Sequence, residues 1–512
     1  MNVWRLIRYW LYVGHRWLGI FACALFAMWF ASGIVMTVIG FPTLDETARQ
    51  QALRPIDWTR VAVTPNQLLA ALPLERYPRE LALEMLLDKP VYRVRDWDGS
   101  RRTISAERIE NVGETDVPAA TNVASDYANA PAQLIATIDQ DQWTVPEGYI
   151  ALRPLHKLAI DDAAGTQVYV SGASGEVVLA TTRTQRFWNW LGAVPHWIYF
   201  TELRANQPVW RQVNLWASGP AILVAVSGIW IGVLRIRVRS RHAHRVAADE
   251  PSATMSPYHG WKLWHHWLGL IGGVFLLTWI VSGWLSVNPN QWFSGGWPTP
   301  LQWLQYSGHR GLTYEANLLA IARPDTKRVI FYYVAGEPVA RVIYSAGESI
   351  VDARTGKSIE FSDRQLFAAM AKVLPKHEVL TRERLIEDDL HWYSHHDQRR
   401  LPVLRTTFDD PSHSWFYVDP KSGEIVDFSD DKSRRYRWWF NAIHRWDLTP
   451  LIQNRPLWYT LIWTFASAGL ALSISGVVIG WRRVKRKAIQ IHNSRHKDDH
   501  RLDAEESLKR TR

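Results

Sequence analysis

The sequence predicts a membrane α-helical protein with four transmembrane helices, an internal two-fold repeat and two α+β domains outside the membrane. Four long stretches carry no charged residue, namely 17–39, 213–234, 263–287 and 457–481. Each has the roughly 20 apolar residues needed to cross about 30 Å of hydrocarbon. The mean hydropathy of the whole chain is only −0.18, which excludes a protein made entirely of membrane helices and leaves room for two large polar segments.

The repeat is visible in the spacing of histidines and glycines. His15 and His265 each begin a His-x-Trp-Leu-Gly sequence and stand 18 residues before Gly33 and Gly283, which close Ser-Gly pairs. His196 and His444 each stand 32 residues before the first glycine of a Gly-x-x-x-Gly sequence, at Gly228 and Gly476. We therefore interpret the chain as two copies of one membrane unit, each crossing the membrane twice in the same direction.

The distribution of charge predicts the orientation. The net charge is +10, and basic residues gather before the first apolar stretch and after the second and fourth. These residues are Arg5, Arg8, Arg235, Arg237, Arg239, Arg241, Arg245, Arg482, Arg483, Lys485, Arg486 and Lys487. Positive segments stay in the cytoplasm, so both termini are predicted to be cytoplasmic and the large domains external. Contact with membrane lipid accounts for the basic residues, and we expect no nucleic-acid binding.

These signals divide the chain into eight segments. The first is the 1–40 region of transmembrane helix 1, which is too long for the apolar part of a cleaved signal peptide, so we expect an anchored helix. The others are an external domain at 41–185, an interfacial segment with helix 2 at 186–235, a cytoplasmic loop at 236–262, helix 3 at 263–287, a second external domain at 288–435, an interfacial segment with helix 4 at 436–487, and a charged cytoplasmic tail at 488–512, expected to be disordered after residue 495.

Both external domains are expected to combine helices with antiparallel strands. Residues 65–74 have helical spacing behind a Thr64 cap. Alternating apolar residues around turn sequences predict three hairpins, near Gly99, near Gly336 and before Gly423. The only cysteine is Cys23, so no internal disulfide is possible.

The four repeated histidines predict two metal-binding pairs. Ionisable residues in membrane helices are rare and usually functional, and two imidazoles bind haem iron as a low-spin, electron-transferring centre. The expected depth of each histidine in the membrane pairs His15 with His265 near the cytoplasm. It likewise pairs His196 with His444 near the outer surface. Pairing within each half would need side chains to reach across the bilayer. Gly19 and Gly269 lie at i+4 from their histidines. They either allow a flat macrocycle to approach the helix backbone or simply allow close helix packing.

Alternatives remain open at these sites. His266 competes with His265 as the ligand. Zinc competes with haem, although a structural zinc normally takes four ligands. The chain has no Cys-x-x-Cys-His sequence, so the expected cofactor is two non-covalent haem b groups. A further cluster, with His391, His395 and His396, is either a substrate or metal contact or a solvated polar loop.

Several motifs resemble the PepSY-associated transmembrane family. They are the His-Arg-Trp-Leu-Gly at 15–19, Leu-Pro-Val-Leu-Arg at 401–405 with Phe408-Asp409-Asp410, Tyr417-Val418-Asp419-Pro420 with Gly423, Arg437-Trp438 with His444, and Ser475-Gly476 through Gly480-Trp481. The first half departs from this pattern, with Ser171-Gly172 where the second half has Asp419-Pro420. The external domains are accordingly expected to be PepSY-like.

The resemblance implies a function. Members similar to this chain include inner-membrane siderophore reductases, which bind two haems and release iron from ferric siderophores by reduction. We therefore expect a multi-pass protein of the bacterial inner membrane, with periplasmic domains, that acts as a haem-dependent ferric-siderophore reductase in iron uptake. Its electrons would come from quinol or a separate reductase, since the chain has no dinucleotide-binding motif. The alternative is a non-enzymatic PepSY protein that binds or regulates periplasmic partners.

Overall fold

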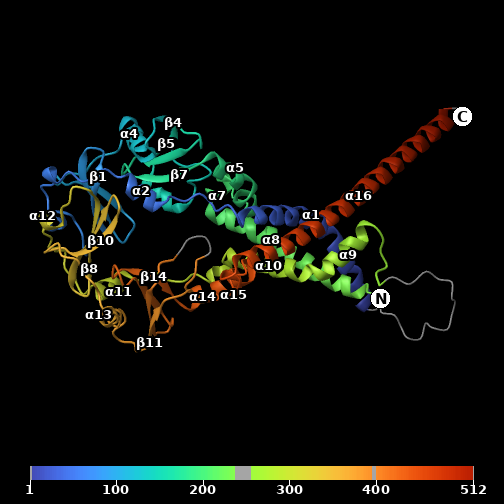
Figure 1. Ribbon diagram of the computed structural model, residues 1–512. Helices are drawn as coiled ribbons and strands as arrows, with labels where there is room; N and C mark the ends of the chain where they lie inside the picture. The colour runs from blue at the N-terminus through green and yellow to red at the C-terminus, as the bar shows by residue number, and fades with distance from the viewer. Residues whose placement is uncertain (1–2, 237–254, 395–398, 511–512) are drawn as a thin grey trace.

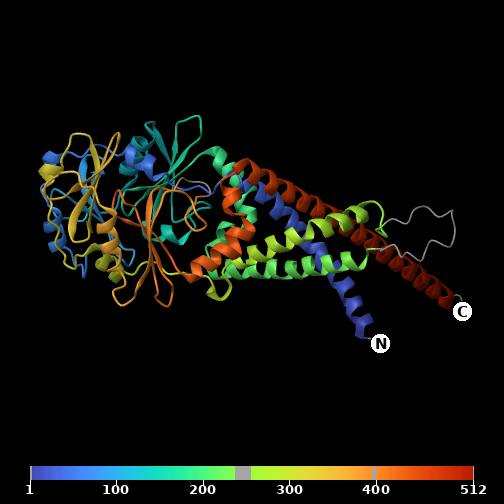
Figure 2. The same ribbon diagram turned by 60° about the horizontal axis from the view of Figure 1, so that its bottom comes forward.

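Apolar helices form one end of the molecule and β-sheets the other in the computed structural model, as Figures 1 and 2 show. The structure describes the backbone of residues 3–236, 255–394 and 399–510, with side chains to residue 493. The basic positions Arg237, Arg239, Arg241 and Arg245 and the histidines His395 and His396 lie outside the described residues. We refer to the two ends as the helix bundle and the sheet region.

Three helices of the bundle are long and apolar enough to cross a membrane: α1 (Val3–Met36), α8 (Gln207–Leu234) and the part of α16 (Arg455–Arg510) up to residue 493. A fourth span exists if α9 (Trp261–Ile271) and α10 (Gly273–Ser286), which meet at an angle of 63°, count as one. Pro220 lies inside α8 without ending it.

The bend between α9 and α10 has a local cause in the sequence. Gly272 and Gly273 lie at the break, and sharp helix bends occur where glycines weaken the hydrogen-bonded ladder. Counting from His15 and His265, the matching positions in α1 are Ala22 and Cys23. Alanine and cysteine keep α1 continuous through this region, so the two helices differ in shape although their histidines match.

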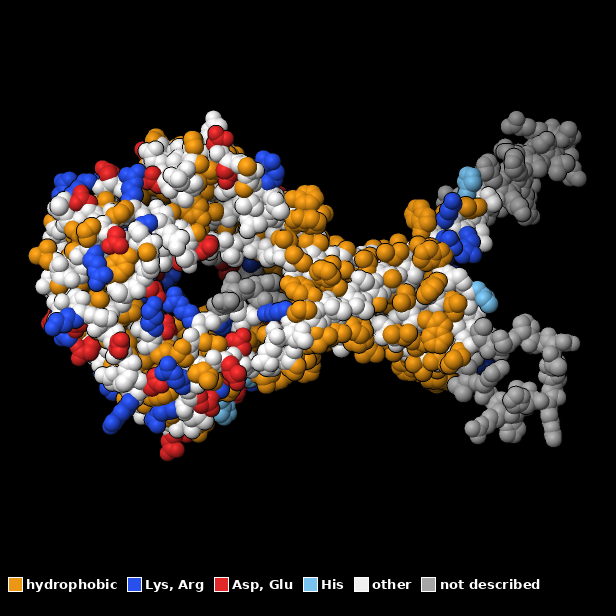
Figure 3. All heavy atoms as spheres, viewed as in Figure 1, with side chains coloured by type: hydrophobic (Ala, Val, Ile, Leu, Met, Phe, Trp, Pro, Cys, Tyr) orange, Lys and Arg blue, Asp and Glu red, His pale blue; other side chains and the backbone are white. Residues whose placement is uncertain are grey.

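Small and aliphatic residues hold the bundle together and large apolar residues cover its outside. The buried side chains come from all four parts: Ala22, Phe26, Ala221, Val224, Ala225, Leu276, Ile280 and Leu472. Figure 3 shows the resulting belt of exposed apolar side chains, followed on α16 by basic residues. Trp216 and Phe21 are 75% and 76% exposed there, as expected for residues that face lipid.

The tail differs from the prediction. Helix α16 continues without a break to Arg510, whereas the sequence was expected to be disordered after residue 495. The charged tail contains Lys, Arg, Glu, Ala and Leu, which have high helix propensity, and it contains no Pro or Gly. High charge alone therefore gave the wrong expectation, because the residues that carry it extend the preceding helix.

A six-stranded antiparallel sheet forms the part of the sheet region farthest from the bundle. Its order is β10-β9-β8-β1-β2-β3, so both halves of the chain contribute three strands. The strands are β1 (Glu80–Leu86), β2 (Lys89–Arg95), β3 (Arg101–Ser105), β8 (Thr326–Val334), β9 (Glu337–Tyr344) and β10 (Gly347–Asp352). The central pairing of β1 with β8 aligns Ala82 with Ile330, which lie 248 residues apart.

Two four-stranded sheets lie between the six-stranded sheet and the bundle (Figures 1 and 2). One contains β4 (Ala132–Ile138), β5 (Leu155–Ile160), β6 (Gln167–Ser171) and β7 (Val177–Thr181). The other contains β11 (Val379–Leu385), β12 (Val403–Phe408), β13 (Trp415–Val418) and β14 (Ile425–Ser429). Strands β5 and β12, and likewise β7 and β14, begin and end 248 residues apart.

Short helices cap and connect these sheets. Helix α4 (Val117–Ala128) packs on the first small sheet and α13 (Asp363–Met370) on the second. Helix α3 (Pro65–Ala71) begins with the predicted Thr64 cap. The remaining short elements are α2 (Glu46–Ala52), η1 (Trp58–Arg60), η2 (Glu147–Leu152), η4 (Pro289–Gln291), α11 (Pro300–Ser307) and α12 (Leu318–Ile321).

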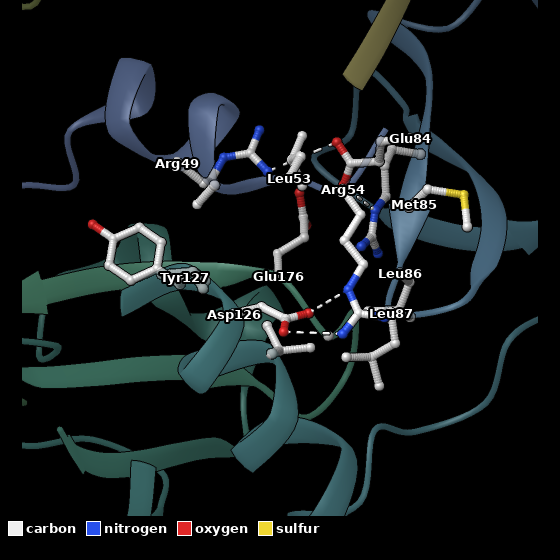
Figure 4. A pocket seen from close by; sticks show the side chains of 15 residues that line it. Arg49, Leu53, Arg54, Glu84, Met85, Leu86, Leu87, Asp126, Tyr127 and Glu176 are labelled. Atoms are coloured by element: carbon white, nitrogen blue, oxygen red, sulfur yellow. Dashed lines mark hydrogen bonds and ion pairs between the residues drawn. The ribbon is translucent and has the colours of Figure 1, made fainter. Parts of the chain in front are cut away.

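One face of the six-stranded sheet carries buried charge. Glu84 on β1 is fully buried and lies 2.9 Å from Arg93 on β2 and 3.4 Å from Arg328 on β8. Arg49 on α2 approaches Glu84 to 3.8 Å. Arg49, Glu84 and Arg93 line a pocket of about 50 Å³ together with Glu176. Figure 4 shows Arg49, Glu84 and Glu176 around this pocket. These ion pairs join strands from both halves of the chain, so the two segments predicted as separate domains share a charged interface as well as a sheet.

Candidate functional site

Two short connections carry histidines from the sheet region into the bundle. The first comprises α5 (Arg183–Leu191), α6 (Ala193–His196) and α7 (Thr201–Arg204). His196 is the last residue of α6. The second comprises α14 (Asp431–Tyr436), the π-helical turn η5 (Arg437–Ala442) and α15 (Thr449–Ile452), and places His444 just after η5. Because both connections enter at the same end of the bundle, their histidines come together there.

Each of the four predicted histidines rests against a Ser-Gly pair of another helix. The ring of His196 contacts Ser32 and Gly33 of α1, and His444 contacts Ser282 and Gly283 of α10. At the other end of the bundle, the ring of His15 contacts Ser227 and Gly228 of α8, and His265 contacts Ser475 and Gly476 of α16. One arrangement therefore occurs four times.

The glycine in each pair makes room for the imidazole. A Cβ atom on Gly228 would lie only 2.8 Å from Cε1 of His15. The corresponding distance is 3.3 Å for Gly33 and His196, 3.4 Å for Gly283 and His444, and 3.3 Å for Gly476 and His265. An added side chain would therefore displace the ring at Gly228, and it would meet the ring in a close contact at the other three glycines.

The serine in each pair accepts a hydrogen bond from the imidazole. The distances from Nδ1 to Oγ are 3.2 Å for His15, 3.1 Å for His196, 2.9 Å for His265 and 3.0 Å for His444. Each serine donates its own proton to a backbone carbonyl one turn earlier in its helix. The serine oxygen is then left to accept, so the proton between the two groups belongs to Nδ1.

Backbone carbonyls give the same assignment independently. Nδ1 of each of three histidines lies 3.2 Å from a backbone carbonyl oxygen. The carbonyl belongs to Val224 for His15, to Trp29 for His196 and to Trp279 for His444. A carbonyl oxygen can only accept, so Nδ1 carries the hydrogen. In a neutral imidazole the other nitrogen, Nε2, then keeps a free lone pair, which is the form that binds a metal.

The structure brings His196 and His444 together. Their ring centroids lie 6.2 Å apart and their planes cross at 73°. Two imidazoles that share one metal ion, at about 2 Å per bond, have ring centroids roughly 6 Å apart. We call these two residues the sheet-side pair. The indole of Trp279 also donates to the carbonyl oxygen of His444 at 2.9 Å, which fixes the position of this segment.

His15 and His265 form a second pair at the opposite end of the bundle, which we call the far-side pair. A Cβ atom on Gly476 would meet both the ring of His265 and the side chain of Cys23 on α1, the helix that carries His15. Along α1, His15 precedes Ser32 by 17 residues, which corresponds to about 26 Å at 1.5 Å per residue. The two pairs therefore lie at different depths of the bundle, on the axis expected for a path across a membrane.

His266 differs from its neighbour His265. Its Nδ1 lies 2.8 Å from Oγ of Ser256 and its Nε2 lies 2.9 Å from the carbonyl oxygen of Gly232. Both ring nitrogens are therefore used in hydrogen bonds within the protein, and the side chain ties the segment before α9 to the end of α8. His266 fills a structural role in this arrangement, whereas His265 keeps one nitrogen free.

Gly19 and Gly269, the glycines at i+4 from His15 and His265, contact neighbouring helices. A Cβ atom on Gly19 or Gly269 would lie 3.8 Å from Val224 or Leu472, an ordinary contact with the neighbouring helix. These two glycines thus pack helices together, and the glycines that receive imidazoles are those of the Ser-Gly pairs. Within the described part of the chain, no group of three or more His, Cys, Asp or Glu side chains gathers as a metal site, so histidine pairs are the available ligand sets.

His391 lies in the sheet region near the second connection. Its ring packs edge-on against Trp415 at 5.0 Å and Trp438 at 6.4 Å, and burial lowers its pKa to about 4, although nearby Asp389 acts in the opposite direction. The described residues 391–394 are not helical. His391 is a neutral, half-buried side chain among aromatic rings.

Comparison with known proteins relates the second half of the chain to one family. Residues 263–503, which contain most of α9, all of α10, the second small sheet and most of α16, match the family model described as the PepSY-associated TM region. No curated protein matches the chain. The matched region includes His265 and His444, together with the Ser-Gly pairs at 282–283 and 475–476.

Proposed function

We propose that this chain, whose residues 263–503 match the PepSY-associated TM family, is an inner-membrane b-type haem protein. It would carry electrons outward and reduce ferric chelates such as siderophores in the periplasm. The far-side pair, His15 and His265, would hold one haem and the sheet-side pair, His196 and His444, the other.

The observation that supports this proposal is the state of the four imidazoles. All four have Nδ1 bonded to a serine of another helix, which leaves Nε2 free. Histidines that ligate metals commonly donate their second N–H in this way. The 6.2 Å spacing of the sheet-side pair would allow both imidazoles to bind one iron, and paired histidines without a third ligand would fit haem better than zinc.

The proposal includes a duplicated architecture with four spans. The matching strand bounds at a spacing of 248 residues and the four repeated His-to-Ser contacts support two copies of one unit. Each copy would contribute two spans, with the bent pair of α9 and α10 as one of them, and one PepSY-like domain built on a four-stranded sheet.

The orientation follows from charge. Arg482, Arg483 and Lys485 are exposed beyond the apolar part of α16, at the end of the bundle away from the sheets. Positive residues at this end favour the cytoplasmic side, which would place the sheet region in the periplasm and both termini in the cytoplasm.

The redox balance requires a separate electron donor. Quinol or a cytoplasmic reductase would be oxidised, and each electron that leaves the sheet-side site would convert one chelated Fe³⁺ to Fe²⁺. A quinol releases two electrons and two protons, so it would reduce two ferric ions. Bound haem supplies one-electron transfer, while the protein holds the ligands, excludes water and sets the potential. His391, His395 and His396 are proposed to contact the chelate.

The proposal can be tested on the purified full-length protein. The chemically reduced protein is mixed with a ferric hydroxamate or ferric catecholate chelate, and its visible spectrum is followed while a dye traps ferrous iron. We expect reoxidation with one ferrous ion per electron. His444→Ala should abolish the reaction, and His266→Ala should preserve it because both nitrogens of His266 are already bonded.

Reduced haem that stays reduced with every chelate would overturn the reductase proposal. A folded protein that contains no haem would instead favour the non-enzymatic alternative, a PepSY membrane protein that binds or regulates periplasmic partners.

A further inference from the structure

Arg437 is a buried guanidinium that forms no ion pair with a carboxylate of the described residues. It begins the π-helical turn η5 that leads to His444, and only 6% of its surface is exposed. Its Nε donates to the carbonyl oxygen of Leu390 and its Nη2 to that of Asp447. Its Nη1 is buried and has no hydrogen-bond partner among the described residues, and no described carboxylate forms an ion pair with it.

The neighbouring arginines differ in this respect. Arg405 pairs with Glu383 and with Asp389, and Arg434 pairs with Asp431 at 2.7 Å. Around Arg437 lie the faces of Tyr393 and Trp438, with the guanidinium carbon 5.2 Å and 4.8 Å from the two ring centroids. Aromatic faces attract a cation but contribute less than a carboxylate does to a buried charge.

The position of Arg437 connects this charge to the sheet-side pair. Its hydrogen bond to Asp447 ties it to the chain three residues beyond His444, and Phe440 of the same turn stacks on His444 at 4.9 Å. The matching residue in the first half, 248 positions earlier, is Asn189, whose amide donates to the carbonyl oxygens of Gly40 and Gln185. The charge is therefore on one side of the pair only.

We infer that Arg437 is the receptor for a carboxylate group beside the sheet-side pair. This inference rests on the proposed function, because the carboxylate that fits best is a propionate of the haem proposed at His196 and His444. A buried cation is stable only when it is paired, and a guanidinium binds a carboxylate through geometry that lysine does not reproduce. The group at His444 would reach Arg437 from inside the protein, whereas a carboxylate of a soluble chelate would have to enter from solvent.

The test compares three variants of the full-length protein: Arg437→Gln, Arg437→Lys and the control Arg435→Gln, which removes an exposed arginine two residues earlier. The first measurement, made before any chelate is added, is the haem-to-protein ratio and the midpoint potential of each haem. We expect Arg437→Gln to weaken retention of the sheet-side haem by more than about tenfold. Its midpoint potential should fall, because a lost positive charge favours the oxidised state. Arg437→Lys should restore part of the midpoint potential. If the glutamine variant does not fold, the lysine variant is compared with the wild type instead.

The second measurement separates the two sources of a carboxylate. It is the ratio of KM for ferric citrate to KM for a ferric hydroxamate chelate without carboxylates. With a propionate on Arg437, this ratio stays as in the control while haem retention changes. The opposite result, a raised ratio with unchanged haem, keeps the carboxylate receptor but assigns it to the chelate. If Arg437→Gln matches Arg435→Gln in both measurements, the inference is wrong. A wild-type protein without haem overturns the proposed function itself, so the two failures are distinguishable.

Discussion

Nδ1 of His444 lies 3.0 Å from Oγ of Ser282, and the serine has already donated its own proton to Thr278. This contact determines which nitrogen of His444 is free. Removing the hydroxyl with Ser282→Ala leaves only the longer contact to the carbonyl oxygen of Trp279. Loss of such a supporting hydrogen bond typically weakens metal affinity by about 10- to 100-fold. We expect faster loss of the sheet-side haem to an acceptor apoprotein. Ser286→Ala, on the same helix, should have no effect, since Ser286 bonds only to the backbone of Gly283; equal haem loss from both variants would contradict this role.

A second prediction uses the space beside His15. Gly228→Ala places a methyl group 2.8 Å from Cε1 of His15, so the ring must move away from its present position. The far-side haem should be depleted while the sheet-side haem remains, as measured by redox titration of the purified protein. Gly219→Ala is the matched control in the same helix, because its new methyl group would meet its nearest neighbour at 3.8 Å. Full occupancy of both sites in Gly228→Ala would refute the proposed close contact.

The pairing of the histidines gives a third prediction. His15→Ala and His265→Ala should each remove the far-side haem, and His196→Ala and His444→Ala the sheet-side haem, because each imidazole would supply one of two axial ligands. The absorption and electron paramagnetic resonance spectra of the four variants should therefore fall into two groups. If His15→Ala and His196→Ala removed the same haem, the pairing would be wrong even with haem present.

The charged face of the six-stranded sheet supports a stability prediction. Glu84→Ala would leave the buried Arg93 without the carboxylate that it bonds, while Arg328 would keep its ion pair with Glu80. Removing one partner of a buried ion pair destabilises a protein by about 3–5 kcal/mol. The thermal unfolding temperature of the sheet region should fall, while Glu75→Ala should change it little because the Glu75 side chain is 88% exposed. An unchanged temperature for Glu84→Ala would show that the sheet does not depend on these ion pairs.

The sequence predicted those features that repeat or that depend on local pattern. The apolar stretches located the spanning helices, turn sequences located the hairpins β2–β3, β8–β9 and β13–β14, and matched spacing selected four histidines among eighteen. Such features depend on neighbouring residues along one strand or helix, so a single sequence contains the information for them.

Contacts between distant segments were not predictable in this way. The serines that accept from the imidazoles lie 162–212 residues away along the chain. The sequence shows that each of these serines precedes a glycine, but it does not show which helix faces which histidine. The shared sheet needed β1 to pair with β8 across the two halves, and the role of His266 depended on Ser256 and Gly232 together. The Nη1 of Arg437, which has no hydrogen-bond partner among the described residues, likewise depends on segments that are distant in the sequence.

The central claim is that the two histidine pairs bind haem, and the most direct measurement is the haem content of the purified wild-type protein. Pyridine haemochrome analysis against protein concentration, after expression with ample haem, reports both the type and the number of haems. The account predicts two b-type haems per chain, both non-covalent and both reducible. A correctly folded, monodisperse protein that remains colourless under these conditions would contradict it.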